Sequence, residues 1–519
     1  MNETRNQRPD ATRFSWLPPV SAVLFVALFL GMTSASLAHL LLRDSSIGWH
    51  IRNGEQILST GTIPHQDSFS ATMSGHAWFA WEWLYDVAVG ALDRTAGLNG
   101  VVWLTALLVA LTFALLFRHT YFRSRNLPLA LVLVLLTFCA ATVHLLARPH
   151  IVTWLLVLVW WRILEQVLEE GCRRKLLWLA PLMILWVNVH GGFLLGMVLT
   201  GIALVASLWD RGRGIESAGA SAAGALAAAV LAVAAASFLN PYGWRLHHHV
   251  LSYLSDRFLM QHIDEFRAPT FHFAAEWLFA ALALGAIVVM VRRRKKVGPA
   301  DVLLVLFAIA AGLYAYRNIP VACILLSMKT AKLAGRAPSG AGGRAGMLAR
   351  MLAAASRVGE REPGFHWLLW PVVVSVLMFV ACLNGGRLLS RPVIQAEFDA
   401  LKLPVAAAEK LAALDPGEPV LAPDFWGGYL IYRVGPRIKP LVDDRHDLYG
   451  SAFLRDYLTL MHGAAGWQGI LDGIQANWVL LPPKSPLADR LRQTPGWRVV
   501  HEDSVGVLLL RGPARPGLL

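Results

Sequence analysis

Residues 100–117 read GVVWLTALLVALTFALLF, a run without a charged side chain, and Arg118 follows it directly. An α-helix needs about 20 apolar residues to cross the hydrocarbon core of a bilayer. The stretch therefore predicts a transmembrane helix.

The composition extends this prediction to the whole chain. Of its 519 residues, 56% are hydrophobic and only 16% are charged, and the mean hydropathy is +0.49. Soluble domains carry about 25% charged residues, so a purely soluble enzyme is excluded. The apolar residues form long blocks rather than repeats or heptads, which excludes disorder, collagen and coiled coil. We predict a polytopic α-helical membrane protein.

Apolar runs of similar length predict about 11 transmembrane helices. The first run covers 17–42, after a short N-terminal segment at 1–16, and it is too long for the core of a signal peptide. We therefore expect it to be retained as a helix. The remaining runs lie near 127–146, 150–168, 175–190, 192–209, 218–239, 273–291, 300–316, 318–333 and 365–383.

The basic residues predict the orientation of these helices. Lys and Arg concentrate in cytoplasmic loops, and with the N-terminus in the cytoplasm every basic cluster lies on that side. The net charge of +13 is thus explained by orientation and by contact with membrane lipids, and no nucleic-acid partner is expected. The clusters are Arg118, Arg123 and Arg125; Arg173, Arg174 and Lys175; Arg211 and Arg213; Arg292 to Lys296; and a linker at 334–364.

Two larger segments then fall on the extracytoplasmic side. The first external loop, 43–98, is acidic where the rest of the chain is basic. The second segment, 385–519, alternates short strand patterns with helical ones, which indicates a small α/β domain. Strands are predicted at 419–422, 438–442, 478–481, 498–500 and 505–510, and helices at 404–414 and 487–493. The domain has no phosphate-binding glycine motif, and the four cysteines indicate neither disulfides nor a zinc site.

Several polar residues lie at the predicted outer ends of the helices, where ionisable groups usually mark a pair, a pathway or a site. All are on the side of the acidic loop, so we expect them to converge on one outer cavity. The asparagines are equally consistent with helix caps and turns, the arginines with contact to lipid headgroups, and the histidines with structural hydrogen bonds. The candidate binding residues are His50, Arg148, His150, Asn188, His190, Asn240, Tyr242, Arg317 and Asn318.

Three carboxylates of the first loop are candidate catalytic groups. Asp44 follows the first helix almost immediately. A carboxylate at this position can act as the base that deprotonates an incoming hydroxyl or amine. It is also placed to pair with Arg43 or to cap the next helix. A role in a turn or as an N-cap explains Asp67 as well as a catalytic role does. Glu82 lies between Trp81 and Trp83, which favours a site or a structural ion pair over a solvated surface.

These motifs resemble those of bacterial GT-C-like membrane glycosyltransferases over nearly the whole chain. The resemblance rests on Asp44 with Trp49-His50, on Pro64-His65 with Asp67-Ser68-Phe69-Ser70, and on Glu82-Trp83-Leu84. It continues through Arg148-Pro149, Asn188-x-His190-Gly191-Gly192, Asn240-Pro241-Tyr242-Gly243 and Arg317-Asn318. In the tail it includes Trp426-Gly427-Gly428-Tyr429 and the segment from Val442 to Gly450.

The resemblance implies an enzyme of the bacterial inner membrane that uses a polyprenyl-phosphate sugar donor and a glycan, lipid or protein acceptor. Asp44 matches the acidic residue that acts as base or metal ligand in this class. Relatives often carry a second acidic residue where this chain has Ser46, so participation of a divalent cation stays open. Arg148, His190 and Arg317 would hold the lipid phosphate.

Two other functions remain open. A lipid-linked glycan polymerase or ligase would use similar donor chemistry. A non-enzymatic lipid or polysaccharide transporter or assembly protein would be favoured by charges deep within several spans. Because we expect the charges to concentrate at one face, we rank the enzyme first.

Overall fold

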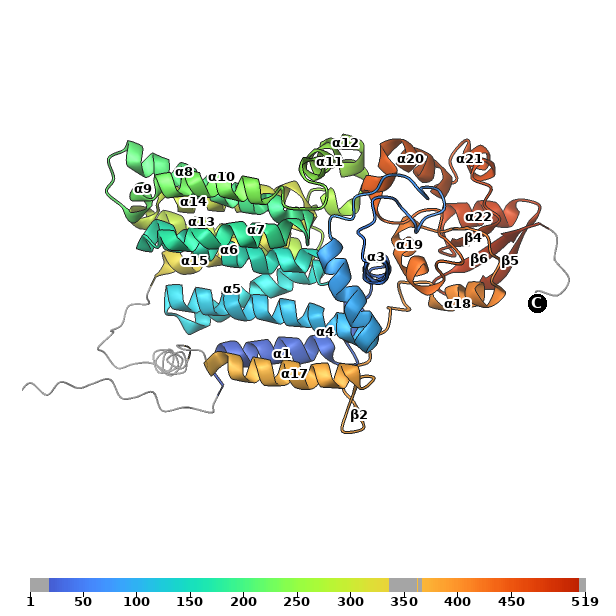
Figure 1. The fold of residues 1–519 in the computed structure, drawn as a ribbon, viewed down its shortest axis with the longest axis horizontal. Helices are drawn as coiled ribbons and strands as arrows, with labels where there is room; N and C mark the ends of the chain where they lie inside the picture. The colour runs from blue at the N-terminus through green and yellow to red at the C-terminus, as the bar shows by residue number, and fades with distance from the viewer. Residues whose placement is uncertain (1–17, 336–361, 363–365, 513–519) are drawn as a thin grey trace, which may run out of the picture.

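The computed structural model describes residues 18–335, 362 and 366–512 (Figure 1). Apolar helices form a bundle, and a smaller domain with a β-sheet lies at one end of it. The expected cytoplasmic N-terminus at 1–16 and most of the linker at 334–364 lie outside the described residues.

By length and composition, five of the described helices are able to cross a membrane. They are α4 (Trp83–Ser124), α5 with the turn η1 (Leu127–His144), α6 (His150–Glu170), the turn η3 with α8 (Gly191–Gly212), and α13 (Ala274–Arg292). Four more apolar helices are shorter: α1 (Val20–Thr33), α10 (Ala223–Ala236), α14 (Pro299–Tyr314) and α17 (Leu369–Leu383). The two remaining predicted runs contain α7 (Leu179–Val187) and α15 (Ile319–Ala334). The helical membrane architecture is thus supported, with five helices of full spanning length.

The N-terminal part differs from the expectation in two places. The first run does not form one helix, because α1 ends at Thr33 and the short α2 (Ala38–Leu41) follows it. The first external loop contains a helix, α3 (Ser46–Thr60), and α4 already begins at Trp83. The early part of α4 precedes a break at Gly97 (φ 61°). The residues of α4 before Gly97 pack against α3, which explains why the helix begins earlier than its apolar run. A hydropathy profile does not detect such a tertiary contact.

Helix α3 lies between α4 and a helix of the C-terminal domain, α19 (Asp424–Arg433). A Cβ atom at Gly48 would lie 2.2 Å from the carbonyl oxygen of Gly428, and a Cβ at Gly54 would lie 1.8 Å from that of Asp86. Only glycine fits at these two positions of α3. The loop and the domain are thereby joined by direct backbone contact.

The C-terminal domain has a four-stranded sheet in the order β3-β4-β6-β5. Strand β3 (Val420–Leu421) is parallel to β4 (Trp478–Leu481), whereas β6 (Val507–Arg511) is antiparallel to both β4 and β5 (Trp497–Glu502). Helices α18 (Val405–Leu414), α20 (His446–Met461), α21 (Trp467–Gly473) and α22 (Pro486–Gln493) complete it. A separate two-stranded ribbon, β1 (Arg387–Leu388) with β2 (Arg391–Pro392), follows α17.

Most of the predicted domain elements are confirmed, but 438–442 is not a strand. Only Pro440 pairs there, through an isolated bridge to Val420. Pro440 has no N–H to donate, and its carbonyl accepts from the backbone N–H of Ala71 in the first loop. The bridge consists of two hydrogen bonds, from Val420 N–H to the Lys439 carbonyl and from Leu441 N–H to the Val420 carbonyl, and the pairing ends with them.

The expectation that charges concentrate at one face is wrong. Lys329 of α15 is 1% exposed, and its Nζ lies 2.9 Å from Oε1 of Glu165 and 3.2 Å from Oδ1 of Asp301. Glu165 is roughly 22 Å along α6 from His150, at 1.5 Å per residue. The cluster thus lies at the end of the bundle away from the domain. It also contains Arg123, Glu169 and Lys332.

Candidate functional site

A cavity of about 1040 Å³ lies where the outer helix ends, the first external loop and the C-terminal domain meet. Helices α6 and α8 begin at it and α14 ends at it. The structure brings seven of the predicted site residues to its wall: Asp44, Glu82, Arg148, His150, His190, Arg317 and Asn318.

Arg148 is the central cation of this cavity. Its Nη1 lies 2.6 Å from Oε1 of Glu265 and 3.4 Å from Oδ2 of Asp44. The guanidinium of Arg317 lies over the ring of Phe266, 4.5 Å from its centroid. Burial alone would raise the pKa of Glu265, but the charges of Arg148 and Arg317 hold it well below its usual range. Glu265 was not predicted, because no local pattern marks it.

Asp44 shares a serine with a carboxylate of the C-terminal domain. Its Oδ1 accepts from the backbone N–H (2.9 Å) and the hydroxyl (2.5 Å) of Ser46, so it supports the first turn of α3. The Ser46 hydroxyl also contacts Asp444, which accepts from Trp49 Nε1 at 3.0 Å. Burial, followed by the charge of Asp44, raises the pKa of Asp444. Asp44 pairs with Arg148 rather than with Arg43, which donates to the carbonyl of Thr142.

Glu82 lies between two histidines. Its Oε2 is 3.8 Å from Nε2 of His50, and its Oε1 is 3.8 Å from Nε2 of His190. The side chain is 13% exposed, and no described residue forms a hydrogen bond with it. Burial, followed by the charge of Asp86, raises the pKa of Glu82 to about 7, and the neighbouring His50, Arg148 and Arg317 oppose this rise. Glu82 is therefore a carboxyl that changes protonation near neutral pH.

On the side away from Glu82, the Nδ1 atom of each histidine contacts another polar group. Nδ1 of His190 accepts from the backbone N–H of Gly192 at 3.0 Å and lies 2.8 Å from Thr153 Oγ1, so the neutral ring carries its proton on Nε2. Nδ1 of His50 lies 2.6 Å from Asp86 Oδ1, and its Nε2 faces Glu82. Burial lowers the pKa of His50 to about 3 and that of His190 well below its ordinary value. Glu82 thus lies between two neutral imidazoles, and the one of His190 presents its N–H toward it.

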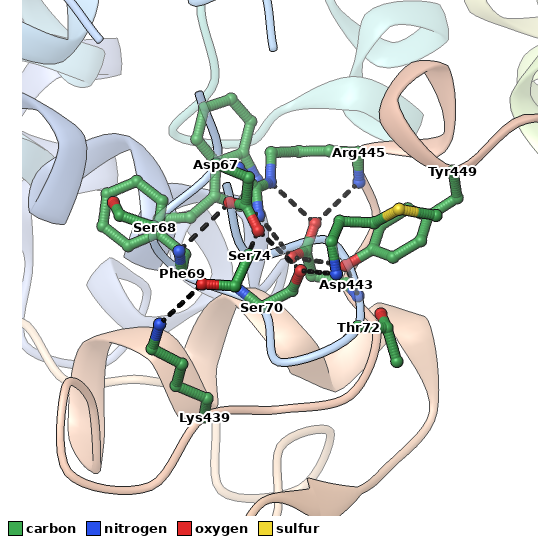
Figure 2. A network of polar contacts seen from close by, with 12 residues as sticks. Asp67, Ser68, Phe69, Ser70, Thr72, Ser74, Lys439, Asp443, Arg445 and Tyr449 are labelled. Atoms are coloured by element: carbon green, nitrogen blue, oxygen red, sulfur yellow. Dashed lines mark hydrogen bonds and ion pairs between the residues drawn. The ribbon is translucent and has the colours of Figure 1, made fainter. Parts of the chain in front are cut away.

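Asp67 lies outside the cavity, in a buried ionic network that fastens the loop to the domain (Figure 2). Its Oδ1 is 2.8 Å from Nη2 of Arg445, which also pairs with Asp443 at 2.7 Å. Burial would raise the pKa of Asp67, but Arg445 and hydrogen bonds from Ser70 and Phe69 lower it. Asp67 therefore has the structural role predicted for a turn residue, and it also forms an ion pair with Arg445 of the C-terminal domain.

Three other predicted residues hold the chain in place beside the cavity. Asn188 caps the end of α7 by donating to the Ile184 carbonyl at 2.7 Å and also accepts from Trp83 Nε1 at 2.7 Å. Asn240 accepts from the backbone N–H of Tyr242 at 2.8 Å. The Tyr242 hydroxyl accepts from Ala80 N (2.7 Å) and donates to the Pro64 carbonyl (3.0 Å). These contacts match the capping and turn interpretation of the two asparagines.

Two residues of the cavity wall also bond to backbone carbonyls. Nε2 of His150 lies 2.7 Å from the carbonyl oxygen of His144, and Asn318 donates to the carbonyl of Ala311 at 3.0 Å. Their remaining polar atoms are the ones available to the cavity.

The C-terminal domain contributes residues that were not chosen as site residues. Their signal in the sequence is the run Asp443-Asp444-Arg445-His446-Asp447, which is part of the resemblance. The domain residues on the cavity wall include Asp424, Phe425, Asp444, His446, Asp447 and Tyr457.

In the part of the chain that the structure describes, no group of three or more His, Cys, Asp or Glu side chains is arranged to hold a metal ion. Comparison with protein-family models and with curated protein sequences found no match. The functional argument therefore rests on the geometry of the cavity.

Proposed function

We propose that this protein is a membrane glycosyltransferase that moves a sugar from a polyprenyl-phosphate donor to an extracytoplasmic glycan, lipid or protein acceptor. The proposal includes a GT-C-like arrangement of about 11 spans in a bacterial inner membrane, with a cytoplasmic N-terminus. The observation that carries it is a cavity that combines an apolar wall, two arginines and an uncommitted carboxyl.

The apolar wall suits an isoprenoid chain. It is formed by α8, α14 and α15, and Val198 of α8 is 42% exposed. A lipid chain on this wall would bring its phosphate toward Arg148 and Arg317 at the outer helix ends. Charge-assisted contacts to a phosphate are among the strong hydrogen bonds of proteins. The apolar residues are Leu194, Leu195, Val198, Phe307 and Val321.

Glu82 is the group best suited to take the acceptor proton. In the proposed step the proton of an acceptor hydroxyl moves to Glu82 and the oxygen bonds to the anomeric carbon of the sugar. The bond from that carbon to the phosphate oxygen breaks, and the lipid phosphate leaves with the electron pair. Arg148 and Arg317 stabilise the charge that develops on the phosphate. No step is assigned to a metal ion.

A transporter is the second candidate, favoured by the buried cluster around Lys329. Within this cluster Lys329, Lys332 and Arg123 face Glu165, Glu169 and Asp301, so the charges are paired with one another. Pairing of this kind also serves to join α4, α6, α14 and α15. We therefore keep the enzyme as the first proposal, with a polymerase or ligase as its variant.

Binding of a polyprenyl-phosphate analogue to the purified protein tests the donor site. Arg148→Ala and Arg317→Ala should each weaken binding by about 1.5–3 kcal/mol, or roughly 10- to 160-fold. Arg437→Ala is the control, because Arg437 is an exposed residue of the C-terminal domain paired with Asp415. Unchanged affinity in folded Arg148 and Arg317 variants would reassign both residues to contacts with lipid headgroups.

A further inference from the structure

The C-terminal domain forms one wall of the cavity, and this wall contains a histidine whose ring orientation is fixed. Nε2 of His446 lies 2.7 Å from Oδ2 of Asp424, whose Oδ1 accepts from the Tyr457 hydroxyl at 2.9 Å. The hydroxyl in turn accepts from the backbone N–H of Asp424 at 2.9 Å. Each carboxylate oxygen of Asp424 thus has a hydrogen-bond partner, and the bond from Oδ2 fixes the orientation of the His446 ring.

The other nitrogen of that ring is available. No described residue forms a hydrogen bond with Nδ1 of His446, and the residue lines the cavity. Burial would lower the pKa of His446, but the hydrogen bond to Asp424 and its charge outweigh burial and raise it. A histidine oriented by a carboxylate in this way presents one polar atom in a fixed direction.

An aromatic ring lies beside this pair. Phe425 follows Asp424 at the start of α19, lines the same cavity and is 55% exposed. Binding sites for small molecules combine aromatic surface with a few oriented polar groups, and an apolar ring face next to hydrogen-bonding groups matches the two kinds of surface on a sugar ring.

The charges on this wall argue against an anionic ligand. Asp444 and Asp447 line it together with Asp424. Its basic residues are Arg445, which is paired with Asp67 and Asp443, Lys402, which is exposed, and the histidines His446, which is paired with Asp424, and His462. The cationic groups Arg148 and Arg317 come from the outer ends of the membrane helices rather than from the domain, although the charge of Arg148 acts on Asp444. The two walls therefore suit ligands of different charge.

We propose that the C-terminal domain carries the acceptor subsite of the cavity and that this subsite binds a neutral, hydroxyl-rich glycan. A sugar ring of the acceptor packs on Phe425, and one of its hydroxyls bonds to Nδ1 of His446. The word acceptor rests on the proposed function, whereas the glycan site itself rests on the geometry of this wall.

The test uses the full-length protein in detergent and two hexasaccharide classes of equal length. Cellohexaose, maltohexaose and mannohexaose are the neutral probes, and a galacturonic acid hexamer is the acidic comparator. At least one neutral probe should bind, more tightly than the acidic hexamer, and Phe425→Ala and His446→Ala should each weaken its binding by about tenfold or more.

Two matched controls separate the subsite from general effects. His501 is also paired with an aspartate, Asp503 at 3.0 Å, but lies outside the cavity, and Phe273 is 61% exposed away from it. His501→Ala and Phe273→Ala should bind the neutral probe like the wild type. All four variants should bind the polyprenyl-phosphate analogue within about twofold of wild type.

The outcomes distinguish this inference from the proposed function. The subsite is overturned if no neutral hexasaccharide binds up to about 10 mM, if the acidic hexamer binds better, or if Phe425→Ala and His446→Ala bind like their controls. If the neutral glycan binds as expected but the lipid analogue does not bind the wild type, the glycan site stands and the proposed transferase fails.

Discussion

Glu82 and Asp44 are two carboxyls of one cavity with different surroundings. Asp44 is held by Ser46 and lies 3.4 Å from Arg148, so its negative charge already has partners. Among the described residues, the ion-pair partners of Glu82 are two imidazole nitrogens at 3.8 Å. A base needs a free lone pair and a pKa near the working pH. Glu82 has the free lone pairs that Asp44 lacks, and its pKa is about 7.

Replacing Glu82 by Gln keeps the size of the side chain and removes its basicity. We expect sugar transfer from a polyprenyl-phosphate donor to fall by about 10²–10⁴-fold, with thermal stability maintained. Asp44→Asn is the matched comparison and should lower the rate less. A larger loss in Asp44→Asn than in Glu82→Gln would make Asp44 the base.

The pH dependence of transfer gives a second test of the same residue. The deprotonated form of Glu82 is the active base, and its pKa is about 7. The rate should therefore rise as pH increases from 5, reach half its maximum near pH 7 and level off above about 8. His50 and His190 stay neutral over this range, because burial lowers the pKa of both. The nearby charge of Asp86 raises the pKa of Glu82, whereas those of Arg148 and Arg317 lower it.

The rise in transfer rate with pH should persist in Asp44→Asn and should be absent from the residual activity of Glu82→Gln. A wild-type rate that does not change between about pH 5 and 8 would be incompatible with Glu82 as base.

At the scale of elements, contact between α3 and α19 sets how the loop and the domain form the cavity. A Cβ at Gly428 would lie 2.3 Å from the carbonyl oxygen of Ser45. Gly428→Ala should therefore push the helices apart and destabilise the protein by about 1–3 kcal/mol or more, as measured by thermal unfolding in detergent.

Gly469→Ala is the control for this change. Gly469 lies in α21, and a Cβ there meets no atom within 4 Å. The control should be neutral or slightly stabilising, because alanine favours the helix. Equal stability of Gly428→Ala and the wild type would show that α3 and α19 are not in close contact.

The sequence predicts elements better than it predicts how they meet. Hydropathy located the helices of the bundle, and short apolar runs located β4 and β6, because those patterns are local. The polar residues at the outer helix ends were expected to share a cavity, and Arg148 and His190 do. Glu265 and the His446–Asp424 pair were missed, because their partners are distant in sequence.

At the scale of the whole molecule, the cavity and the basic clusters lie at opposite ends of the bundle. Helix α6 begins at the cavity with His150 and ends at Glu170, before the basic residues at 173–175. Helix α14 ends at the cavity with Tyr314 and begins after the basic residues at 292–296. Basic clusters face the cytoplasm, so the cavity and the C-terminal domain should face outward.

Cysteine labelling in intact cells tests this orientation. Cys139 and Cys172 are the more accessible native cysteines and are replaced by serine, while Cys323 and Cys382 are buried and kept. Lys484→Cys, exposed on the domain, should react with a membrane-impermeant maleimide in intact cells. Lys295→Cys, exposed at the other end, should react only after the inner membrane is permeabilised. The opposite pattern would place the cavity in the cytoplasm, away from an extracytoplasmic acceptor, and the proposed transferase would then have to be abandoned.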